Sequence, residues 1–569
     1  MRSPSVLTIV AVLAGAAASA SAQPATARVP APASPLPAVT VPAVRAVKPA
    51  LPETEVVEPT GEGADIRVSI ARVIVEGVTI YGEDALGEAL TAVIGEAIPI
   101  ATIDAARLAI LRRYRDDGYA LTAVSAIVEA GGVLRLRITE GRIADVKLDG
   151  DIGSAGVQVL RFLRRLTEPA VIDTATLERA LLLAGDVPGV SLSAVLRPSA
   201  SEPGALTLVA QVSRRAFGGQ VSVDNRAFSS VGPEQLLGVF DANSFSEYGE
   251  HSQAQIYRTL SGAQLFGQAS VDSFIGDSGL RIRLYAGRGI SRPTGSFRSI
   301  DYVGGTTLAG AELSYPLIRS RRQTLNVLGN LDLVNASVDQ TGQGSRDNLR
   351  VVRAGIDYVV SDFVLGDNRS AVNSVTLRLS QGLTALGAST PDGPVSRPGQ
   401  IPAFRKYAAE FSRTQTLLQP WEGASLALQG VLAGQYTADV LPAAEKFFLG
   451  GTRLARGFYY GEVTGDNAVA STLELQFNTV NEVEVFGVHA EWSTQLYGFY
   501  DWAQTWERLD GEQGRRLRSA GMGVRFIPSS RVEIGLEAVR RITRFPGGSG
   551  PGIAPLPGDA FYWRVLARF

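Results

Sequence analysis

The sequence has no cysteine and only two histidines, His251 and His489. The missing cysteines exclude disulfides, thiolate zinc sites, cysteine nucleophiles and amino-terminal lipid attachment. The two histidines fall in separate strand-like segments far apart in the chain. We therefore expect no metal site and no cofactor.

An excess of one charge and long apolar runs are also missing. The chain has 54 basic and 56 acidic residues, whereas nucleic-acid binding needs a basic excess on one face, so we expect no nucleic-acid partner. Beyond the amino-terminal segment no run of about 18 apolar residues occurs, which argues against a helical membrane span.

The amino terminus is typical of an exported protein. Residues 1–22 are a predicted secretory signal peptide, with a basic Arg2, an apolar run over 6–18 and small residues before the expected cleavage site. Residues 23–65 are rich in proline and alanine. Proline at this density favours extended polyproline segments, so we interpret this stretch as a linker.

Two consecutive units, 66–141 and 142–214, share one order of elements: a strand, two helices and two strands. In the first unit a strand is predicted over Val68–Val75, a helix over 84–94, and a second helix from Thr102 that ends at Gly118. Two alternating segments follow as a predicted hairpin. The second unit repeats this order, which predicts tandem small α+β domains.

From 215 to 569 the sequence shows strand patterns and almost no helical period. Apolar residues alternate with charged or polar ones, as in 280–286, 324–333 and 473–477. Segments of this kind suit tilted membrane strands, and an even number suits a closed antiparallel barrel. About sixteen of them start near residues 219, 235, 251, 264, 279, 306, 321, 348, 369, 402, 423, 467, 491, 515, 530 and 561.

The connections between these segments tend to alternate in length, as expected for a membrane barrel. A soluble β-sandwich would show the same apolar alternation along its strands, but this pattern of connections favours the barrel. The predicted turns are 276–279, 316–320 and 528–530, the predicted long loops are 384–401, 437–466 and 542–560, and 478–490 is longer than a simple turn.

The chain ends as a last barrel strand would, with an apolar face that finishes on Phe569. This terminal residue is similar to the signal that the outer-membrane assembly machinery reads. Because a bilayer forbids open sheet edges, the sequence predicts a 16-stranded antiparallel transmembrane β-barrel over 215–569. The residues of the apolar face are Phe561, Trp563, Val565, Ala567 and Phe569.

The longest predicted loop, 437–466, contains a glycine-rich segment with an arginine at its tip. Glycine allows positive φ and close backbone approach, and the guanidinium of Arg456 keeps its charge and therefore needs a carboxylate partner. The segment lacks the spacing and lysine of a phosphate-binding loop; an ordinary surface loop is the alternative. Its candidate site residues are Gly450, Gly451, Arg456, Gly457 and Phe458.

Phe499 and Asp501 share one face of the strand that contains them. An unpaired carboxylate in hydrocarbon is costly, so we expect both side chains to face the lumen, where Asp501 could pair with Arg456. An aspartate exposed to water near the barrel rim is the alternative.

Catalysis is not expected. The sequence Gly276-Asp277-Ser278-Gly279 is similar to a serine-protease nucleophile motif, but Leu280 follows it. No histidine lies in a supporting pattern, and a polar turn explains the segment.

These features together resemble a TpsB-type transporter of the hemolysin secretion/activation protein family, which shares a superfamily with the BAM outer-membrane insertase. The segment Leu454–Phe458 is similar to the superfamily's VRG[YF] motif, with Ala455 where valine is usual, and Phe499-Tyr500-Asp501 is similar to its FxD motif. The two small units resemble POTRA (polypeptide-transport-associated) domains, the first at Tyr114–Tyr119 and Glu140-Gly141 and the second at 186–189.

The resemblance implies a fold, a location and a function. The long loop would fold into the lumen and place Arg456 against Asp501; the barrel would lie in outer-membrane lipid, with the POTRA domains in the periplasm. The chain would secrete, with or without activating it, an unfolded exported polypeptide that contacts the POTRA domains and the pore. Family members often carry a pore-plugging helix, but the prolines of 23–62 disfavour one here.

Two other functions are alternatives to secretion. An outer-membrane barrel insertase, or a lipid-handling member of the same superfamily, is the main alternative. Two POTRA-like units favour secretion, because the insertase typically has more. A passive porin would not explain the POTRA-like units.

Overall fold

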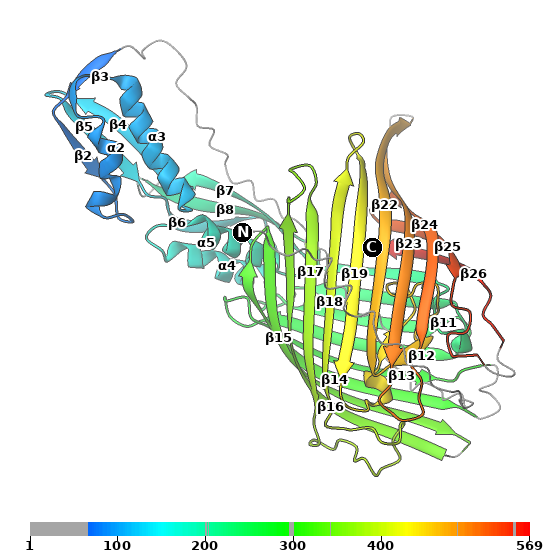
Figure 1. Ribbon diagram of the computed structural model, residues 1–569. Helices are drawn as coiled ribbons and strands as arrows, with labels where there is room; N and C mark the ends of the chain where they lie inside the picture. The colour runs from blue at the N-terminus through cyan, green and yellow to red at the C-terminus, as the bar shows by residue number, and fades with distance from the viewer. Residues whose placement is uncertain are drawn as a thin grey trace.

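The architecture comes from a computed structural model, which describes residues 66–199, 202, 204–294, 301–341, 343–485, 488–549 and 554–569. The predicted signal peptide, 1–22, and linker, 23–65, lie outside the described residues. Two small α/β domains extend from one end of a large barrel (Figure 1). In the described ranges, no helix combines the length and the apolar character needed to cross a membrane.

The first POTRA-type domain is built on a three-stranded sheet of order β2-β5-β4, in which β2 runs parallel and β4 antiparallel to β5. Strands β1 and β3 form a separate antiparallel pair. The elements are β1 (Arg67–Ile70), β2 (Arg72–Glu76), η1 (Glu83–Leu86), α2 (Gly87–Thr91), β3 (Gly95–Pro99), α3 (Ile100–Asp116), β4 (Ala123–Glu129) and β5 (Val133–Thr139).

Two predictions for this domain are wrong in detail. The single strand over Val68–Val75 is divided at Ala71, whose N–H donates to Gly132 O at 2.7 Å instead of continuing either ladder. The helix over 84–94 is reduced to η1 and the short α2, because the chain from Gly95 onward pairs with β1 as strand β3.

Helix α3 ends as its sequence predicts and buries one tyrosine completely. Gly118 has φ 93°, a backbone that glycine adopts without strain, and the N–H of Tyr119 donates back to Tyr114 O at 2.7 Å. This is the hydrogen-bond pattern of a Schellman C-cap. The Tyr114 side chain is fully buried in the core of the domain.

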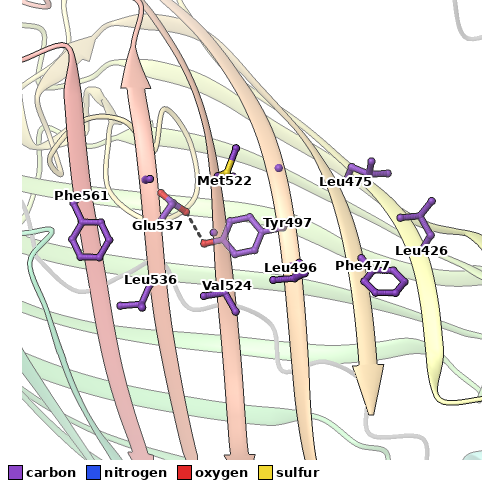
Figure 2. A pocket seen from close by; sticks show the side chains of 13 residues that line it. Leu426, Leu475, Phe477, Leu496, Tyr497, Met522, Val524, Leu536, Glu537 and Phe561 are labelled. Carbon is purple, nitrogen blue, oxygen red and sulfur yellow. Dashed lines mark hydrogen bonds between the residues drawn. The ribbon is translucent and has the colours of Figure 1, made fainter. Parts of the chain in front are cut away.

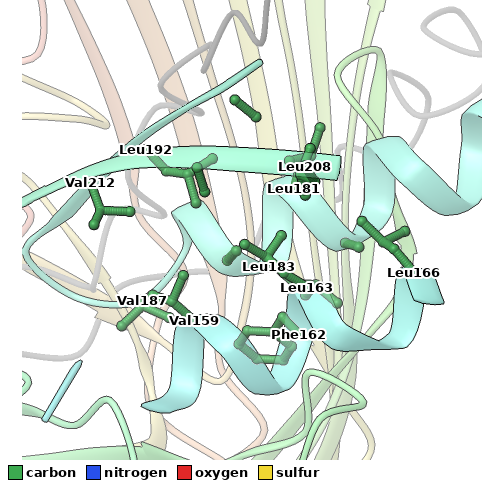
Figure 3. Close-up of a cluster of buried hydrophobic side chains, with 14 of the residues drawn as sticks. Val159, Phe162, Leu163, Leu166, Leu181, Leu183, Val187, Leu192, Leu208 and Val212 are labelled. Carbon is green, nitrogen blue, oxygen red and sulfur yellow. The ribbon is translucent and has the colours of Figure 1, made fainter. Parts of the chain in front are cut away.

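The second POTRA-type domain packs two helices on a sheet of order β6-β8-β7. Its core is formed by leucines, valines and Phe162 (Figure 3). Asp173 caps α5, since its side chain accepts from Thr176 N at 2.8 Å. The elements are β6 (Arg142–Asp149), α4 (Ala155–Arg164), η2 (Arg165–Thr167), α5 (Thr174–Gly185), β7 (Val190–Pro198) and β8 (Ala205–Arg214).

Sixteen antiparallel strands of the described chain close into a barrel, which confirms the predicted fold class. The last strand pairs with the first, from Arg564 opposite Asp224 to Arg568 opposite Gln220. The strands are β9 (Phe217–Asp224), β10 (Gln235–Asn243), β11 (His251–Thr259), β12 (Gln264–Phe274), β13 (Arg281–Ser291), β14 (Val303–Arg319), β15 (Gln323–Gln340), β16 (Gln343–Asp362), β17 (Ala371–Gly382), β18 (Arg405–Leu418), β19 (Ala424–Thr437), β22 (Asn467–Val485), β23 (Val488–Trp506), β24 (Arg516–Ser529), β25 (Val532–Arg541) and β26 (Asp559–Arg568).

Two predicted connections are wrong. Residues 478–490 form no long loop, because β22 and β23 remain paired out to Val485 opposite Val488. Pro316 does not begin a turn; it lies inside β14 where the register with β15 shifts. A proline is tolerated there because a bulge needs one fewer ladder hydrogen bond.

The second POTRA-type domain contacts the turns at one end of the barrel, which we call the POTRA end. Arg319 donates to Asp186 through Nε at 2.8 Å and through Nη2 at 2.7 Å. Phe162 packs edge-on against Phe274 with ring centroids 5.1 Å apart. The opposite end, the far end, carries the long loops.

Candidate functional site

The long loop between β19 and β22, residues 438–466, folds back into the barrel. It contains η5 (Ala443–Glu445) and a hairpin of β20 (Phe447–Leu449) with β21 (Val463–Gly465). Small inward-facing residues on the wall leave room for this loop. Its buried members Leu449, Leu454, Ala455, Phe458 and Val463 pack against Ala433, Ala470, Ala503 and Leu517 of the barrel strands.

Two glycines are required by the close approaches that the loop makes. Gly450 has φ 105°, and a Cβ there would lie 1.9 Å from the carbonyl oxygen of Tyr459. A Cβ on Gly457 would lie 2.5 Å from Cβ of Ser519 on β24. The first glycine therefore permits the fold of the loop, and the second lets its tip touch the barrel wall.

Ala455 adopts a left-handed backbone with φ 55° and is buried. A Cβ disfavours this conformation, and for a β-branched side chain it is a marked outlier. Alanine therefore suits this backbone better than the valine of the motif that the segment resembles.

Arg456 joins the loop tip to two carboxylates on the barrel wall. Its backbone N–H donates to Asp501 Oδ2 at 2.6 Å and its Nη2 donates to Asp501 Oδ1 at 3.4 Å, while Nη1 donates to Glu474. Its guanidinium carbon lies 3.7 Å from the ring centroid of Phe499. The side chains of Arg456 and Asp501 are 5% and 0% exposed. The arginine thus has both charged partners and an aromatic surface on β22 and β23.

Arg226, from the connection between β9 and β10, holds the same loop tip from another side. Its Nη1 donates to Gly451 O at 2.8 Å and to Arg456 O at 2.7 Å, and its Nη2 donates to Glu537. Glu537 in turn accepts from the Tyr497 hydroxyl at 2.8 Å (Figure 2). Backbone carbonyls of the loop are therefore fixed by a buried side chain of the barrel.

Two further arginines complete this luminal network. Arg541 Nε donates to Gly457 O at 2.6 Å, and Arg525 Nη1 donates to Glu474 Oε1 at 3.0 Å. Buried charge arrays contribute less to stability than to defining one geometry, and the loss of one member leaves its partner uncompensated. The network therefore specifies a position for the loop tip.

A second charge cluster, at the far end, ties the base of the long loop to its neighbours. Arg397, from the loop between β17 and β18, donates to Asp466 Oδ1 at 2.8 Å and to Glu512 Oε2 at 2.7 Å. Lys446 Nζ donates to Glu507 Oε1 at 2.9 Å. Three loops are thus joined by charge pairs around the fully buried Asp466.

The structure brings most of the sequence-predicted site residues together. Arg456, Phe499 and Asp501 are in contact. Gly451, Gly457 and Phe458 are buried in the same loop, and Gly450 is half-buried there. Phe569 lies elsewhere, at the seam of the barrel, where its N–H donates to Gly219 O at 3.1 Å.

Sequence reasoning missed Glu474, Arg226 and Glu537. The alternation of 473–477 places Glu474 on the polar face, but its position opposite Phe499 depends on the register of β22 with β23. Arg226 and Glu537 come from segments more than 300 residues apart, and no local pattern connects them.

Among the described side chains, no group of three or more histidines, aspartates or glutamates is arranged to hold a metal ion. The chemistry that the luminal groups offer is charge pairing and hydrogen bonding, which position a loop.

Comparisons with known proteins agree with this architecture. The family model described as haemolysin secretion/activation protein ShlB/FhaC/HecB matches residues 207–526, and the model of the ShlB-type POTRA domain matches 68–141. No curated protein sequence matches the chain.

Two solved structures resemble about nine-tenths of the chain. CdiB from Escherichia coli has a TM-score of 0.69 and 18% identity, over 91% of this chain and 93% of that one. CdiB from Acinetobacter baumannii has a TM-score of 0.60 and 15% identity, over 90% and 91%. At these identities the likeness shows the fold. Because the first family model covers more than half of the 569 residues, the chain belongs to the haemolysin secretion/activation protein family ShlB/FhaC/HecB.

Proposed function

We propose how this two-partner secretion transporter works: it receives an unfolded exported polypeptide in the periplasm and passes it through the barrel to the cell surface. The POTRA-type domains lie in the periplasm, outer-membrane lipid surrounds the barrel, and the far end faces outward. The observation that carries this proposal is the combination of a closed barrel, a loop folded into its lumen and two domains with open sheet edges at one end.

Edge strands of the POTRA-type domains are the proposed docking sites for the polypeptide. Strands β4 and β7 end their sheets, and each exposes apolar side chains: Ile127 is 50% exposed, Val128 41% and Val195 43%. An extended segment that adds a strand satisfies backbone donors and acceptors without requiring one sequence.

Passage through the pore requires the long loop to change position. We propose that the network around Arg456 holds the loop in one arrangement at rest and that the arriving polypeptide displaces it. The same network offers no nucleophile with a supporting base, so the chain is proposed to move its substrate without covalent chemistry. Folding of the polypeptide outside would bias the direction of movement.

Assembly of the barrel is proposed to involve the outer-membrane assembly machinery, which would read the strand that ends at Phe569. The outward residues of this strand are exposed, with Phe561 at 58%, Val565 at 42% and Phe569 at 51%. Its inward neighbour Tyr562 is buried, as the alternation of a strand requires.

Secretion of a co-expressed candidate partner, measured in the medium with and without this chain, tests the proposed function. We expect the partner outside the cell only when the chain is present. Defects in the assembly of other barrels on deletion of the chain, with no partner secreted, would instead support an insertase.

A further inference from the structure

The outer wall of the barrel carries a basic and aromatic band near its far end, on β23 and β24. The neighbouring residues Ala503, Thr505, Leu517 and Ser519 are fully buried on the luminal side. Because successive side chains of a strand point to opposite faces, the residues between and beside them point outward. These outward residues are Trp502, Trp506, Arg516 and Arg518.

The two arginines of this band have no carboxylate partner in the described part of the chain. Arg518 lies opposite Trp502 in the strand register, and Arg516 Nη2 donates to Gln504 Oε1 at 3.1 Å. Arg540 on β25 differs, because Asp559 neutralises it at 2.7 Å. The band therefore presents two uncompensated positive charges beside two indole rings.

An apolar furrow of about 580 Å³ lies in the same wall, toward the POTRA end (Figure 2). Five residues lie opposite one another across five neighbouring strands, in the order Leu475, Gly498, Met522, Ala538 and Phe561. The small Gly498 and Ala538 leave gaps between the three larger side chains. Met522 is 69% exposed and Phe561 58%. Ligand-binding pockets fall in this range of volume, roughly 300–1,000 Å³.

The band and the furrow are close enough for one ligand to occupy both. Met522 follows Arg518 by four residues on β24, a separation of about 13 Å along a strand. A ligand with an anionic head and an apolar chain would place the head at the arginines and the chain in the furrow. A peptide in the furrow would leave backbone groups without partners in hydrocarbon.

We propose that this face binds a lipid of the outer leaflet whose headgroup carries phosphate. Arg516 and Arg518 contact the phosphate, the two tryptophans lie at the headgroup level, and one acyl chain lies over Gly498 and Ala538. Tryptophan favours the membrane interface, and basic side chains near a membrane surface attract anionic lipid. This inference rests on the proposed placement of the far end at the cell surface.

Native mass spectrometry of the purified full chain tests the headgroup contact. The probes are lipid A with both phosphates and its dephosphorylated form, each added in detergent. We expect the wild type to prefer the phosphorylated lipid, and the double variant R516Q/R518Q to bind it about 30-fold more weakly, from about 1 kcal/mol for each arginine. The matched control R322Q/R531Q removes two charges from turns at the POTRA end and should bind like the wild type.

A second variant tests the furrow. A Cβ on Gly498 would meet nothing closer than Gly521 O at 3.9 Å, so Gly498→Leu fits the fold and fills the furrow. It should weaken the binding of both forms of the lipid. Equal binding by the wild type and R516Q/R518Q, or no effect of Gly498→Leu, overturns the proposal.

Cell fractionation distinguishes a failure of the proposed function from a failure of the lipid-binding inference alone. If the chain is absent from the outer membrane, the proposed function fails with this inference. If the chain is present there and does not discriminate between the lipids, only the inference fails.

Discussion

Arg456 connects the tip of the long loop to the barrel wall through both its backbone and its side chain. Its backbone N–H and its guanidinium both reach Asp501, and Nη1 reaches Glu474. In the described structure its buried Nε has no hydrogen-bond partner. The arginine is thus held by ion pairs and by Phe499, with one donor left unpaired. Such a buried arrangement defines one position for the loop tip, because separating Arg456 from its carboxylates leaves buried charges uncompensated.

Ala455 provides a prediction about the strain in the loop tip. Its left-handed backbone penalises a Cβ, so Ala455→Gly should favour the observed tip by up to about 1 kcal/mol, whereas Ala455→Val should loosen it. Hydrogen exchange of the amides of 450–460 in the full chain measures the effect.

The matched control for this prediction is Ala444→Gly in the same loop. Ala444 is not among the residues with positive φ. Glycine there relieves no strain and should therefore increase the hydrogen exchange of the amides of 450–460. Faster exchange in Ala455→Gly than in the wild type would contradict the strain argument.

At the scale of elements, the segment 186–189 has a role that its sequence did not reveal. Its sequence resembles a part of the second POTRA-type domain, and the structure shows that the segment also contacts the barrel. Asp186 pairs with Arg319, and Pro188 O accepts from the Ser244 hydroxyl at 2.7 Å. The domain and the barrel are therefore held in one relative orientation by this segment.

The Asp186–Arg319 pair can be tested by removing one charge. Asp186→Asn should weaken the docking of the second domain by about 1 kcal/mol, since the Asp186 side chain is 34% exposed. Spin labels on α5 and on a barrel turn should then report a broader distance distribution. The double variant Asp186→Arg with Arg319→Asp restores the pair with its charges exchanged and should narrow the distance distribution again. An unchanged distribution in Asp186→Asn would show that the pair does not hold the domain.

Glu140 fixes the end of β5 to the loop after β2 in the first POTRA-type domain. It accepts from Thr79 N at 2.9 Å, from Ile80 N at 3.1 Å and from the Tyr114 hydroxyl at 2.7 Å. Burial alone would raise the pKa of Glu140, but the hydrogen bonds from Thr79, Tyr114 and Ile80 outweigh it and lower the pKa below its usual value.

The sign of the pH dependence follows from that lowered pKa. A carboxylate with a lower pKa in the folded state contributes stability above its unfolded pKa of about 4.3, and this contribution is lost as the pH falls through the folded value. Protection of the Thr79 and Ile80 amides, corrected for the intrinsic effect of pH on exchange, should fall in acid. Glu140→Gln should reduce the protection at neutral pH and remove most of its acid dependence; a wild-type profile in this variant would contradict the assignment.

At the scale of the whole molecule, the alternation along the strands predicts a sheet with one apolar face, and the alternating lengths of the connections favour a membrane barrel over a soluble sandwich. The bulge at Pro316 depends on a register shift between β14 and β15, and the extension of β22 and β23 depends on their pairing out to Val485 opposite Val488. Neither follows from the alternation.

A sequence motif and the cost of an unpaired charge in lipid predict the pairing of Arg456 with Asp501. The contacts of three further residues, Glu474, Arg226 and Glu537, could not be predicted from the sequence. They depend on the register of the strands and on the closure of the barrel, which no local pattern supplies.

The central claim is that the loop held by Arg456 belongs to the secretion pore. Its most direct test is the amount of partner polypeptide released by cells that carry the wild type, Arg456→Ala or no transporter, with barrel insertion checked for each. We predict that Arg456→Ala inserts as a barrel and releases little more partner than cells without the chain. Normal release by an inserted Arg456→Ala barrel would contradict the account.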